Sequence, residues 1–338
     1  IIFPLTLLTF CFPIFDSIYL FFTNLMEMVS LNFVRFDYLI FVFGRPSLCW
    51  IFFYYLFLLL YFFSGKKRYM ILTFTLSAIF YFQLVLFPRH FLIFIDVGQG
   101  DSTLIHSGGK TMLIDTGGKL FSSSSIAEDT LVPLLHSFGI RSLHYLILTH
   151  GDYDHMGEAI RLVDAFPVDK VIFNHGKYNE MELGLIQVLD ENEISYYQNI
   201  QKLSMGSHNF YFLNHQLHSD ENNNSIVLYT EFNGKKFLFM GDAGIEVERE
   251  MMKKYNFPNI DVLKVGHHGS KTSSSKEFIH EVNPKYSIIS VGKNNWYHHP
   301  HDSVLDNLKN SKIYRTDQDG SIVVKLENGN MIIEIYAP

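Results

Sequence analysis

One six-residue run holds four potential metal ligands and constrains the fold more than any other feature. The run has the pattern H-x-D-x-D-H and contributes His150, Asp152, Asp154 and His155. It follows residues 143–148, which are apolar and predict a buried strand, and precedes residues 156–166, which predict a helix. Rigid scaffolds often present chemistry on such loops at strand ends. Imidazole and carboxylate groups at this density suit Zn²⁺ or Mn²⁺; the alternative is a polar loop without a ligand.

The composition changes sharply near residue 88. Residues 1–88 are overwhelmingly apolar and aromatic, whereas residues 89–338 have the composition of one large soluble domain. A chain of 338 residues is long enough for two units, and the second can bury a full core. We therefore predict a membrane segment over 1–88 and a hydrolase domain over 89–338. Since the chain begins with Ile1, we expect it to be a piece of a longer protein.

Charge and cysteine usage exclude several classes of protein. The formal net charge of -7 is mildly acidic, so the charge of the whole molecule does not predict nucleic-acid binding. Any such surface must be local. The two cysteines, Cys11 and Cys49, lie in apolar runs, and the predicted hydrolase domain has none. This usage excludes a disulfide framework and a zinc finger.

The apolar segment predicts membrane attachment. Residues 1–22 predict a kinked helix, because prolines interrupt an almost uncharged run, and residues 23–44 predict an interfacial segment. Residues 47–63 and 70–87 predict two spanning helices that form a hairpin. Its short turn carries basic residues at 66–68, which favour the cytoplasmic side. We expect a multi-pass protein of the cell membrane with the hydrolase domain outside; the alternative, a soluble core hairpin, is disfavoured by the aromatic density.

The second segment alternates between predicted strands and helices. Strands are predicted over residues 91–97, 102–106, 111–114, 143–148, 171–174, 225–232, 235–240, 261–265, 286–291, 321–326 and 331–336. Helices are predicted over residues 127–138, 156–166, 181–189, 242–255, 274–282 and 303–310. Much of 175–220 gives no clear pattern. The segment has two successive halves, each with a hairpin followed by alternating elements, which predicts two packed sheets, outer helices and a site along one rim.

Further candidate residues follow other predicted strands. The Asp242 carboxylate can bridge two cations, although the alternative is a helix cap. In the pair His267-His268 we predict His267 as a metal ligand and His268 as a catalytic group, together with Asp154; the alternative is a surface pair. His299 is predicted to act on the substrate, because the following proline restricts its backbone to an extended conformation.

A set of supporting residues is predicted around these ligands. Asp96, Asp101 and Asp115 lie at strand ends and turns, where they either orient ligand histidines or only stabilise turns. Substrate contacts are predicted for four residues: Asn224, Ser225, Ser270 and Lys271. Lys271 is also predicted to form a local phosphate-binding patch with Lys264 and Lys276. The glycine-containing turn at 96–102 lacks the Gly-Lys-Ser/Thr of a nucleotide loop.

Together these motifs resemble the metallo-β-lactamase superfamily, and most of all the C-terminal domain of the ComEC family of DNA-uptake channels. The resemblance covers about residues 91–325 and rests on motifs in the family's order. They are D-V-G-Q-G-D-S from Asp96, L-I-D-T-G from Leu113, the H-x-D-x-D-H run, Gly241-Asp242, H-H-G-S from His267, and His299-Pro300-His301. The resemblance implies an α/β fold, an αββα sandwich preceded by transmembrane helices, and a nuclease for the DNA strand that is not imported.

The same resemblance implies two divalent metal ions, Zn²⁺ or Mn²⁺, and partners that include DNA, the membrane and other competence proteins. Two ions would activate a water molecule and neutralise a phosphodiester. Asp152 stands where the wider superfamily usually has histidine, and this extra oxygen ligand shifts the preference towards Mn²⁺. Two alternatives stay open: a phosphodiesterase for a small phosphoester, and a domain that guides DNA without cleaving it.

Overall fold

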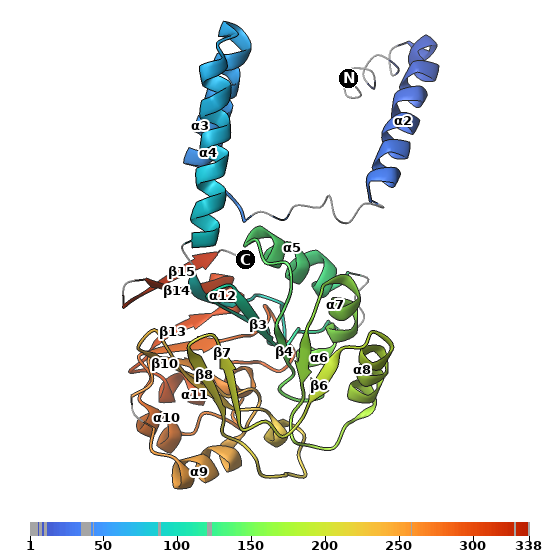
Figure 1. The fold of residues 1–338 in the computed structure, drawn as a ribbon. Coiled ribbons are helices and arrows are strands. Elements are labelled where there is room, and N and C mark those ends of the chain that lie inside the picture. Colours follow the sequence, from blue (N-terminus) through green and yellow to red (C-terminus); the bar gives the residue numbers. More distant parts are fainter. Residues whose placement is uncertain are drawn as a thin grey trace. The chain divides into compact units, whose positions relative to one another are not determined.

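The structure is a computed structural model that describes residues 6, 9, 12–34, 42, 44–86, 89–119, 124–257, 259–327 and 329–336. The chain divides into two units, Ile1–Phe43 and Gly44–Pro338. In the first unit a 3-10 helix spans Pro13–Phe15 and α2 spans Asp16–Val34 (Figure 1). Helix α2 continues across the predicted boundary at residue 22. Residues 35–41 of the predicted interfacial segment lie outside the described residues.

The second unit begins with the predicted apolar hairpin. Helix α3 spans Leu48–Ser64 and helix α4 spans Lys67–Leu86 (Figure 1). Gly65 has a φ of 65°, and its N–H donates to the Tyr61 carbonyl, which ends α3 in a left-handed cap. Large apolar side chains on both helices are exposed. Among the described residues, no helix combines the length and the apolar character that crossing a membrane requires.

The first sheet holds eight strands in the described residues, in the order β15-β14-β1-β2-β3-β4-β5-β6. Their bounds are His90–Phe94 (β1), Thr103–Ser107 (β2), Lys110–Ile114 (β3), Tyr145–Ile147 (β4), Lys170–Ile172 (β5), Ser195–Tyr197 (β6), Ser321–Glu327 (β14) and Asn330–Tyr336 (β15). Strands β1 to β3 form an antiparallel meander, and β3 to β6 are parallel. The closing hairpin β14–β15 joins this sheet through antiparallel pairing of β14 with β1.

The second sheet repeats this plan. It holds seven strands in the described residues, in the order β13-β12-β11-β10-β9-β8-β7. Their bounds are Lys202–Met205 (β7), His208–Phe212 (β8), Leu228–Phe232 (β9), Lys235–Phe239 (β10), Val262–Lys264 (β11), Tyr286–Ile289 (β12) and Lys312–Arg315 (β13). Strands β7 to β10 are antiparallel, and β10 to β13 are parallel. Each half therefore has the predicted order of hairpin first and alternating elements second.

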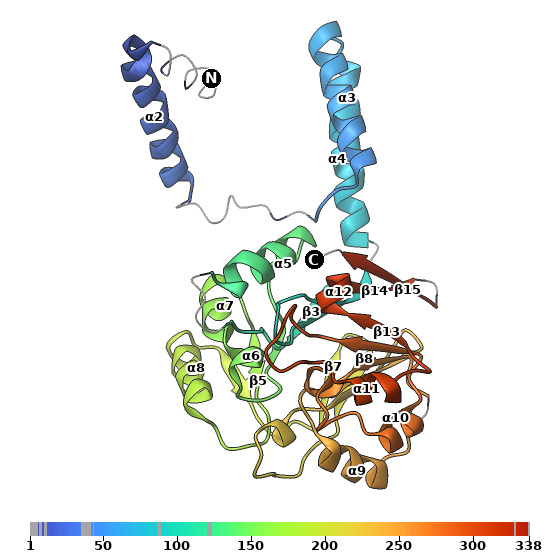
Figure 2. The ribbon, with the colours of Figure 1, turned by 180° about the vertical axis from the view of Figure 1, so that it is seen from behind.

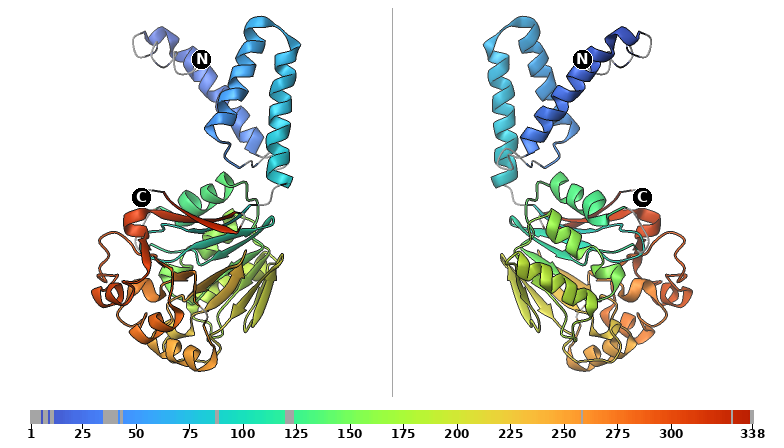
Figure 3. Two further views of the ribbon diagram at one scale, coloured as in Figure 1. Left: turned by 90° about the vertical axis from the view of Figure 1, so that its left-hand side faces the viewer. Right: turned by 90° about the vertical axis from the view of Figure 1, so that its right-hand side faces the viewer.

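The helices cover the outer faces of the two sheets (Figures 1, 2 and 3). Against the first sheet lie α5 (Val132–Ser137), α7 (Ala159–Ala165) and α8 (Glu180–Glu191); against the second lie α9 (Ile245–Lys254), α10 (Lys276–Val282) and α11 (Asp302–Asn307). Shorter elements are η3 (Ala127–Leu131), α6 (Tyr153–Met156), η4 (Asn222–Asn224), η5 (Gly266–Gly269) and α12 (Thr316–Asp319). This layering confirms the predicted αββα sandwich.

Alternating apolar side chains explain why the sheets are covered on both faces. In β1, Leu92 and Phe94 point into the core between the sheets, where Phe94 stacks on Phe239 of β10 at 6.2 Å between ring centroids. The alternate residues Phe91 and Ile93 pack on the helix side of the same sheet. Burying each such side chain stabilises the fold by about 1.5–3 kcal/mol. A strand that is apolar on both faces requires a layer on each side, which is what the sandwich provides.

Two predicted helices and one stretch without a clear predicted pattern differ from the structure. The predicted helix 156–166 is two helices, α6 and α7; α6 already starts at Tyr153, so Asp154 and His155 lie on a helix rather than a loop. The predicted helix 127–138 begins as one π-helical turn, η3, before α5. The unclear stretch 175–220 contributes strands β6, β7 and β8 besides the expected helix α8.

Candidate metal centre

One rim of the sandwich collects the predicted ligands. In the first sheet Asp115 follows β3 and His150 follows β4, and in the second sheet Asp242 follows β10. His267 and His268 follow β11. Because β3 and β4 are parallel to each other, as are β10 and β11, their carboxyl ends open onto one edge of each sheet. Ligands that are distant in sequence thereby come together, as the strand-end pattern predicts.

Among the described residues, four overlapping groups of three potential ligands lie at this rim, and two of the four do not include Asp101. One contains His150, His155 and Asp242, and the other contains Asp154, His155 and His268. Within each group the ligand atoms lie within 4.8 Å of one another. The His155 Nε2 atom is 3.1 Å from Asp242 Oδ1, and the His268 Nε2 atom is 3.2 Å from Asp154 Oδ2. The arrangement therefore joins side chains from both sheets.

The inward-facing atoms lack the partners that buried polar groups normally have. The Nε2 atoms of His150, His155 and His268 and the Oδ1 atom of Asp242 are buried and make no hydrogen bond within the described part of the chain. Buried polar atoms in folded proteins are almost always hydrogen-bonded, so four unpaired atoms at one place need a further partner. Imidazole nitrogens and carboxylate oxygens are donors to Zn²⁺ and Mn²⁺. The residues present therefore fit a divalent cation.

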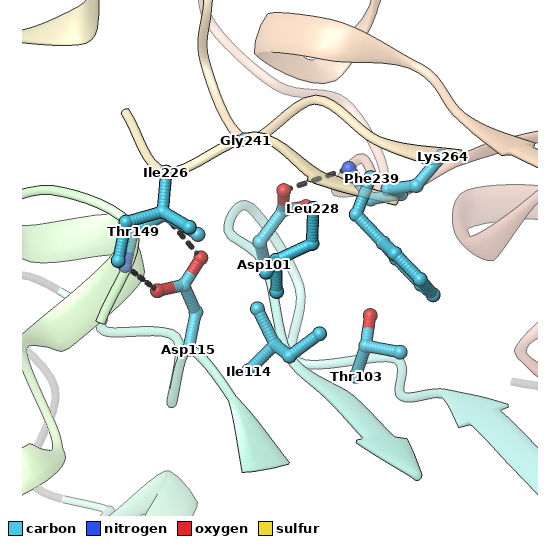
Figure 4. Close-up of a pocket in the computed structure, with 10 residues that line it drawn as sticks. All are labelled: Asp101, Thr103, Ile114, Asp115, Thr149, Ile226, Leu228, Phe239, Gly241 and Lys264. Atoms are coloured by element: carbon cyan, nitrogen blue, oxygen red, sulfur yellow. Dashed lines mark hydrogen bonds and ion pairs between the residues drawn. The ribbon is translucent and has the colours of Figure 1, made fainter. Parts of the chain in front are cut away.

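Asp115 fixes the orientation of His155. The His155 Nδ1–H donates to Asp115 Oδ2 at 2.8 Å, which leaves Nε2 facing the ligand cluster. Asp115 is held in turn by the Thr149 N–H and the Thr149 hydroxyl, both at 2.7 Å (Figure 4). Carboxylates in this position set the tautomer of a metal-binding histidine and raise its basicity. Asp115 is thus placed where it can orient His155.

The other two buried histidines are also held through Nδ1. The His268 Nδ1–H donates to the Ser290 carbonyl at 2.9 Å. The His150 Nδ1 lies 3.3 Å from the Ser225 hydroxyl, which also accepts from the Asp242 N–H at 3.1 Å. Ser225 is fully buried and contacts two candidate ligands. We predicted Ser225 as a substrate contact, but its position lets it orient ligands.

The candidate ligands also hold one another in defined charge states. Burial alone would lower the pKa of His155, but the carboxylates of Asp242 and Asp115 raise it well above its ordinary value. Burial raises the pKa of Asp242, yet His155 and His268 hold it well below its ordinary value. The pKa of Asp154 falls to about 2 despite burial, mainly because the nearby His268 ring, whose Nε2 is 3.2 Å from Asp154 Oδ2, favours the ionised carboxylate. The carboxylates are therefore ionised and ready to bind a cation at neutral pH.

A buried ion pair lies beneath the ligands. The Lys264 ammonium donates to Asp101 Oδ2 at 2.7 Å, and both side chains are buried. They line a small pocket together with Asp115 and Thr149, and Figure 4 shows the two pairs side by side. The predicted phosphate patch is therefore wrong for Lys264, because a paired ammonium in the core cannot reach a substrate. Lys271 and Lys276 are exposed.

The adjacent histidines His267 and His268 have different surroundings. Both have left-handed backbone, with φ of 48° and 52°, so their side chains diverge. His268 is buried and belongs to the ligand cluster. His267 is partly exposed; its Nε2 is 3.7 Å from Asp242 Oδ2 and its Nδ1 is 3.2 Å from the Thr272 hydroxyl. The structure thus places His268 where we predicted His267 as a ligand, and His267 on the outer side.

Asp152 and His299 lie on the open side of the cluster. Asp152 is about half exposed, and its Oδ2 is 3.5 Å from His150 Nε2. The His299 ring is half-buried and stacks near His268, at 6.4 Å between centroids. Burial and the neighbouring His268 and His267 lower the pKa of His299 to about 4. His299 is therefore neutral at pH 7, with one ring N–H to donate.

Four other predicted residues are not brought into the cluster. Asp96 closes its own turn by accepting from the Gly98 N–H. Asn224 is buried and binds the backbone of His218 through both ends of its amide. Ser270 contacts the Thr272 hydroxyl, and Lys271 lies on the surface. Asp96 and Asn224 thus shape loops around the site, and neither touches a candidate ligand among the described contacts.

The family comparison gives one clear match. A family model described as "Metallo-beta-lactamase superfamily" matches residues 95–293, which is more than half of the chain. The chain belongs to the metallo-β-lactamase superfamily. The match includes the H-x-D-x-D-H run, Asp242 and His268, so the rim cluster lies within the region that defines this superfamily.

Curated relatives indicate which group within this superfamily the chain resembles. The chain is 39% identical over 267 residues to ComE operon protein 3 of Bacillus subtilis, covering 72% of this chain and 34% of that protein. It is 30% identical over 242 residues to competence protein ComA of Neisseria gonorrhoeae, covering 70% of this chain and 32% of that protein. These relatives confirm the resemblance to ComEC-type competence proteins, of whose length the chain spans about a third.

A solved structure, the metallo-β-lactamase fold protein YhfI from Bacillus subtilis, is also similar to this chain. Its TM-score is 0.48 at 14% sequence identity, with 70% of this chain and 99% of that chain covered.

In this chain an open groove adjoins the cluster of candidate ligands. Its lining includes Asp152 and Asp154 of the rim and also Lys293, Trp296 and Tyr297. The Trp296 side chain is 94% exposed and Tyr297 is 67% exposed. We did not predict either aromatic residue. The available signal was a tryptophan, one of two in the chain, two residues before His298.

Proposed function

We propose that this chain is a metal-dependent phosphodiesterase that cleaves DNA. The observation that carries the proposal is the set of buried side-chain atoms of His150, His155, His268 and Asp242 that make no hydrogen bond within the described residues. When bound there, a divalent cation supplies an activated water molecule and neutralises the charge of a phosphodiester. An open groove beside the cluster gives an extended substrate room to enter.

The proposed centre holds two divalent ions, Zn²⁺ or Mn²⁺. Six side chains are proposed to bind them: His150, Asp152, Asp154, His155, Asp242 and His268. Three of these six are carboxylates, and the oxygen-rich set favours Mn²⁺. Asp115, Ser225 and the Ser290 carbonyl keep the histidine Nε2 atoms directed at the centre through the contacts described above.

His299 is proposed to contact the phosphate. Its ring stands beside His268 and Tyr297 on the open side, and its Nδ1 is buried without a hydrogen bond among the described residues. With a pKa of about 4 the ring is neutral, so it can donate one N–H to a phosphate oxygen without repelling bound cations.

Single-stranded DNA is the proposed substrate form. Exposed aromatic rings offer stacking faces to unpaired bases, and each stacked base contributes about 1–3 kcal/mol. Trp296 and Tyr297 provide such faces on the same groove as Asp154, and Lys293 adds a positive charge there. A small phosphoester has no run of unpaired bases to stack on these rings.

The biological setting is proposed from the relatives. ComA is named a competence protein, and we propose that this chain degrades the DNA strand that is not imported, together with other competence proteins. We also propose that the apolar hairpin α3–α4 attaches the hydrolase domain to the cell membrane, with that domain outside. The exposed apolar side chains of the hairpin support this, for example Phe62 and Phe63, which are 80% and 81% exposed.

A cleavage assay tests the activity. The full chain in detergent is supplied with Mn²⁺ or Zn²⁺ and given single-stranded DNA, duplex DNA and a small phosphodiester such as bis(p-nitrophenyl) phosphate. We expect metal-dependent cleavage with a preference for single-stranded DNA, and a loss of about 100-fold or more in Asp154→Ala. Cleavage of the small ester alone would favour a small-phosphoester enzyme. Binding of DNA without cleavage by folded, metal-loaded protein would favour a guiding domain and overturn the proposal.

A further inference from the structure

A second cluster of potential ligands lies away from the rim centre and shares no residue with it. His218 is in the segment between β8 and η4, and Glu246 and Glu250 lie one turn apart on α9. One ligand atom from each of these three side chains lies within 4.8 Å of the others. Residues four apart on a helix face the same way, so both carboxylates are presented to the histidine.

The histidine is buried and its inner nitrogen is unpaired. The His218 side chain is 6% exposed. Its Nε2 makes no hydrogen bond within the described residues, although Glu250 Oε2 is 3.4 Å away. That distance exceeds the usual 2.7–3.2 Å of a hydrogen bond. It equals the separation of about 3.4 Å that two atoms have when each lies about 2.1 Å from one tetrahedral ion.

Glu250 is oriented towards this place from behind. In the amide orientation that satisfies its hydrogen bonds, Gln216 donates to both Glu250 oxygens, at 2.8 and 3.0 Å. Glu246 accepts from the Asn223 amide at 3.3 Å. Two carboxylates four residues apart on a helix repel each other, and a shared cation would relieve that repulsion. Such outer contacts are typical of groups that bind metal.

We propose that His218, Glu246 and Glu250 bind one further divalent cation, of the class of Mn²⁺ or Zn²⁺. One imidazole nitrogen and two carboxylates are a common ligand set for these ions, and water completes the coordination. Glu246 is 66% exposed, which gives the ion a path from solvent. The proposal does not depend on the nuclease function.

The position of this site gives the ion a structural role. It would connect α9 to the loop that contains His218, and Asn224 is hydrogen-bonded to the His218 backbone. The next residue, Ser225, contacts His150 and Asp242 of the rim centre. The ion would therefore stabilise the loop that orients two candidate ligands, at a distance from the reaction itself.

Metal counting on the full chain in detergent tests this site. The protein is dialysed against Mn²⁺ and, separately, Zn²⁺, and bound metal per chain is measured by elemental analysis. We expect His218→Asn and Glu250→Gln to bind about one ion fewer than the wild type. The matched controls His280→Asn and Glu277→Gln change exposed residues on α10 and should bind as many ions as the wild type.

A second measurement covers the case in which a buried substitution unfolds the chain. Glu246→Gln changes a mostly exposed side chain and should leave the fold intact, as circular dichroism can verify. We expect the rise in melting temperature on adding Mn²⁺ to be smaller in this variant than in Glu277→Gln. Equal metal content in all variants, together with an equal rise in melting temperature, would overturn the proposal.

Discussion

The three buried histidines of the rim have the same arrangement: another group of the protein contacts Nδ1, and Nε2 faces the cluster of candidate ligands. Holding one nitrogen of an imidazole fixes which nitrogen remains free for a ligand. The three histidines come from the loop after β4, from α6 and from η5, so their supporting groups give them a common direction. Asp115, Ser225 and the Ser290 carbonyl are therefore as informative about the site as the ligands themselves.

Asp115→Asn tests the support of His155. An amide accepts a weaker hydrogen bond from the Nδ1–H than a carboxylate does, so His155 loses basicity and order. We expect the affinity for Mn²⁺ or Zn²⁺ to fall by about 10- to 100-fold, as measured by competition with a chelator. The control is Asp96→Asn, which changes a turn carboxylate and keeps an acceptor for the Gly98 N–H. Equal losses in both variants would contradict the role of Asp115.

Glu182 gives a prediction about pH. Its side chain is almost fully buried in the cap of α8, and burial raises its pKa to about 7 from an ordinary value of 4.5. The folded state therefore binds more protons than the unfolded state between these values, so this group's stabilisation is complete below pH 4.5 and is lost as the pH rises through 7. Glu182→Gln replaces the titrating carboxyl group with a neutral amide, so the variant does not lose this stabilisation as the pH rises. Above pH 7 we expect the variant to be more stable than the wild type, by an amount of order 1 kcal/mol.

Denaturant unfolding across this pH range measures the effect. The wild type and Glu182→Gln should differ little near pH 4.5 and diverge as the pH rises. Glu180→Gln is the control, because Glu180 lies on the same helix and is exposed. A constant difference between wild type and Glu182→Gln at every pH would show that the carboxyl group does not titrate as expected.

At the residue level the sequence predicted many of the residues that gather at the rim but not how each side chain is placed there. The H-x-D-x-D-H run and Asp242 were identifiable because strand ends and ligand chemistry coincide there. The choice between His267 and His268 was not, since it depends on left-handed backbone at both residues. The burial of Lys264 could not be predicted either. Lys264 is on β11 of the second sheet, whereas its partner Asp101 is distant in sequence and precedes β2 of the first sheet.

Among the elements, the loop after β12 carries the proposed stacking surface. Trp296 is almost fully exposed beside a groove that reaches Asp154, an unusual place for a large aromatic side chain unless a ligand covers it. Trp296→Ala should raise the KM for single-stranded DNA by roughly tenfold, because one stacked base contributes about 1–3 kcal/mol. Activity on bis(p-nitrophenyl) phosphate, which needs no stacking, should stay unchanged. A loss on both substrates would indicate damage to the centre instead.

Strongly patterned elements were predictable and short ones were not. The hairpin β9–β10 has an Asn-Gly turn between apolar strands, and the structure has it where predicted. Strands β6, β7 and β8 have three to five residues each and are only partly buried, so each is too short for its alternation to predict a strand. The pairing of β14 with β1 joins strands from opposite ends of the domain, which local patterns do not encode.

For the whole molecule, the candidate centre lies between the two halves of the sandwich. His150 and His155 follow a strand of the first sheet, whereas Asp242 and His268 follow strands of the second. A bound cation would therefore connect the halves and stabilise only the folded state, in which both sets of ligands meet. A ligand at about 100 times its Kd stabilises a protein by about 2.7 kcal/mol. Removing the metal should thus lower both stability and activity.

Chelation of the metal-loaded full chain tests this link. We expect EDTA to lower the melting temperature by several degrees and to abolish DNA cleavage, and added Mn²⁺ to restore both. His150→Ala should show a smaller response to EDTA than the wild type, because one of the proposed ligands from the first sheet is already missing. Since the second cation site at His218 also responds to EDTA, the response should be compared in His218→Asn, where the centre between the sheets is intact. A melting temperature that ignores EDTA while cleavage stops would mean that the cation serves the chemistry without joining the two sheets.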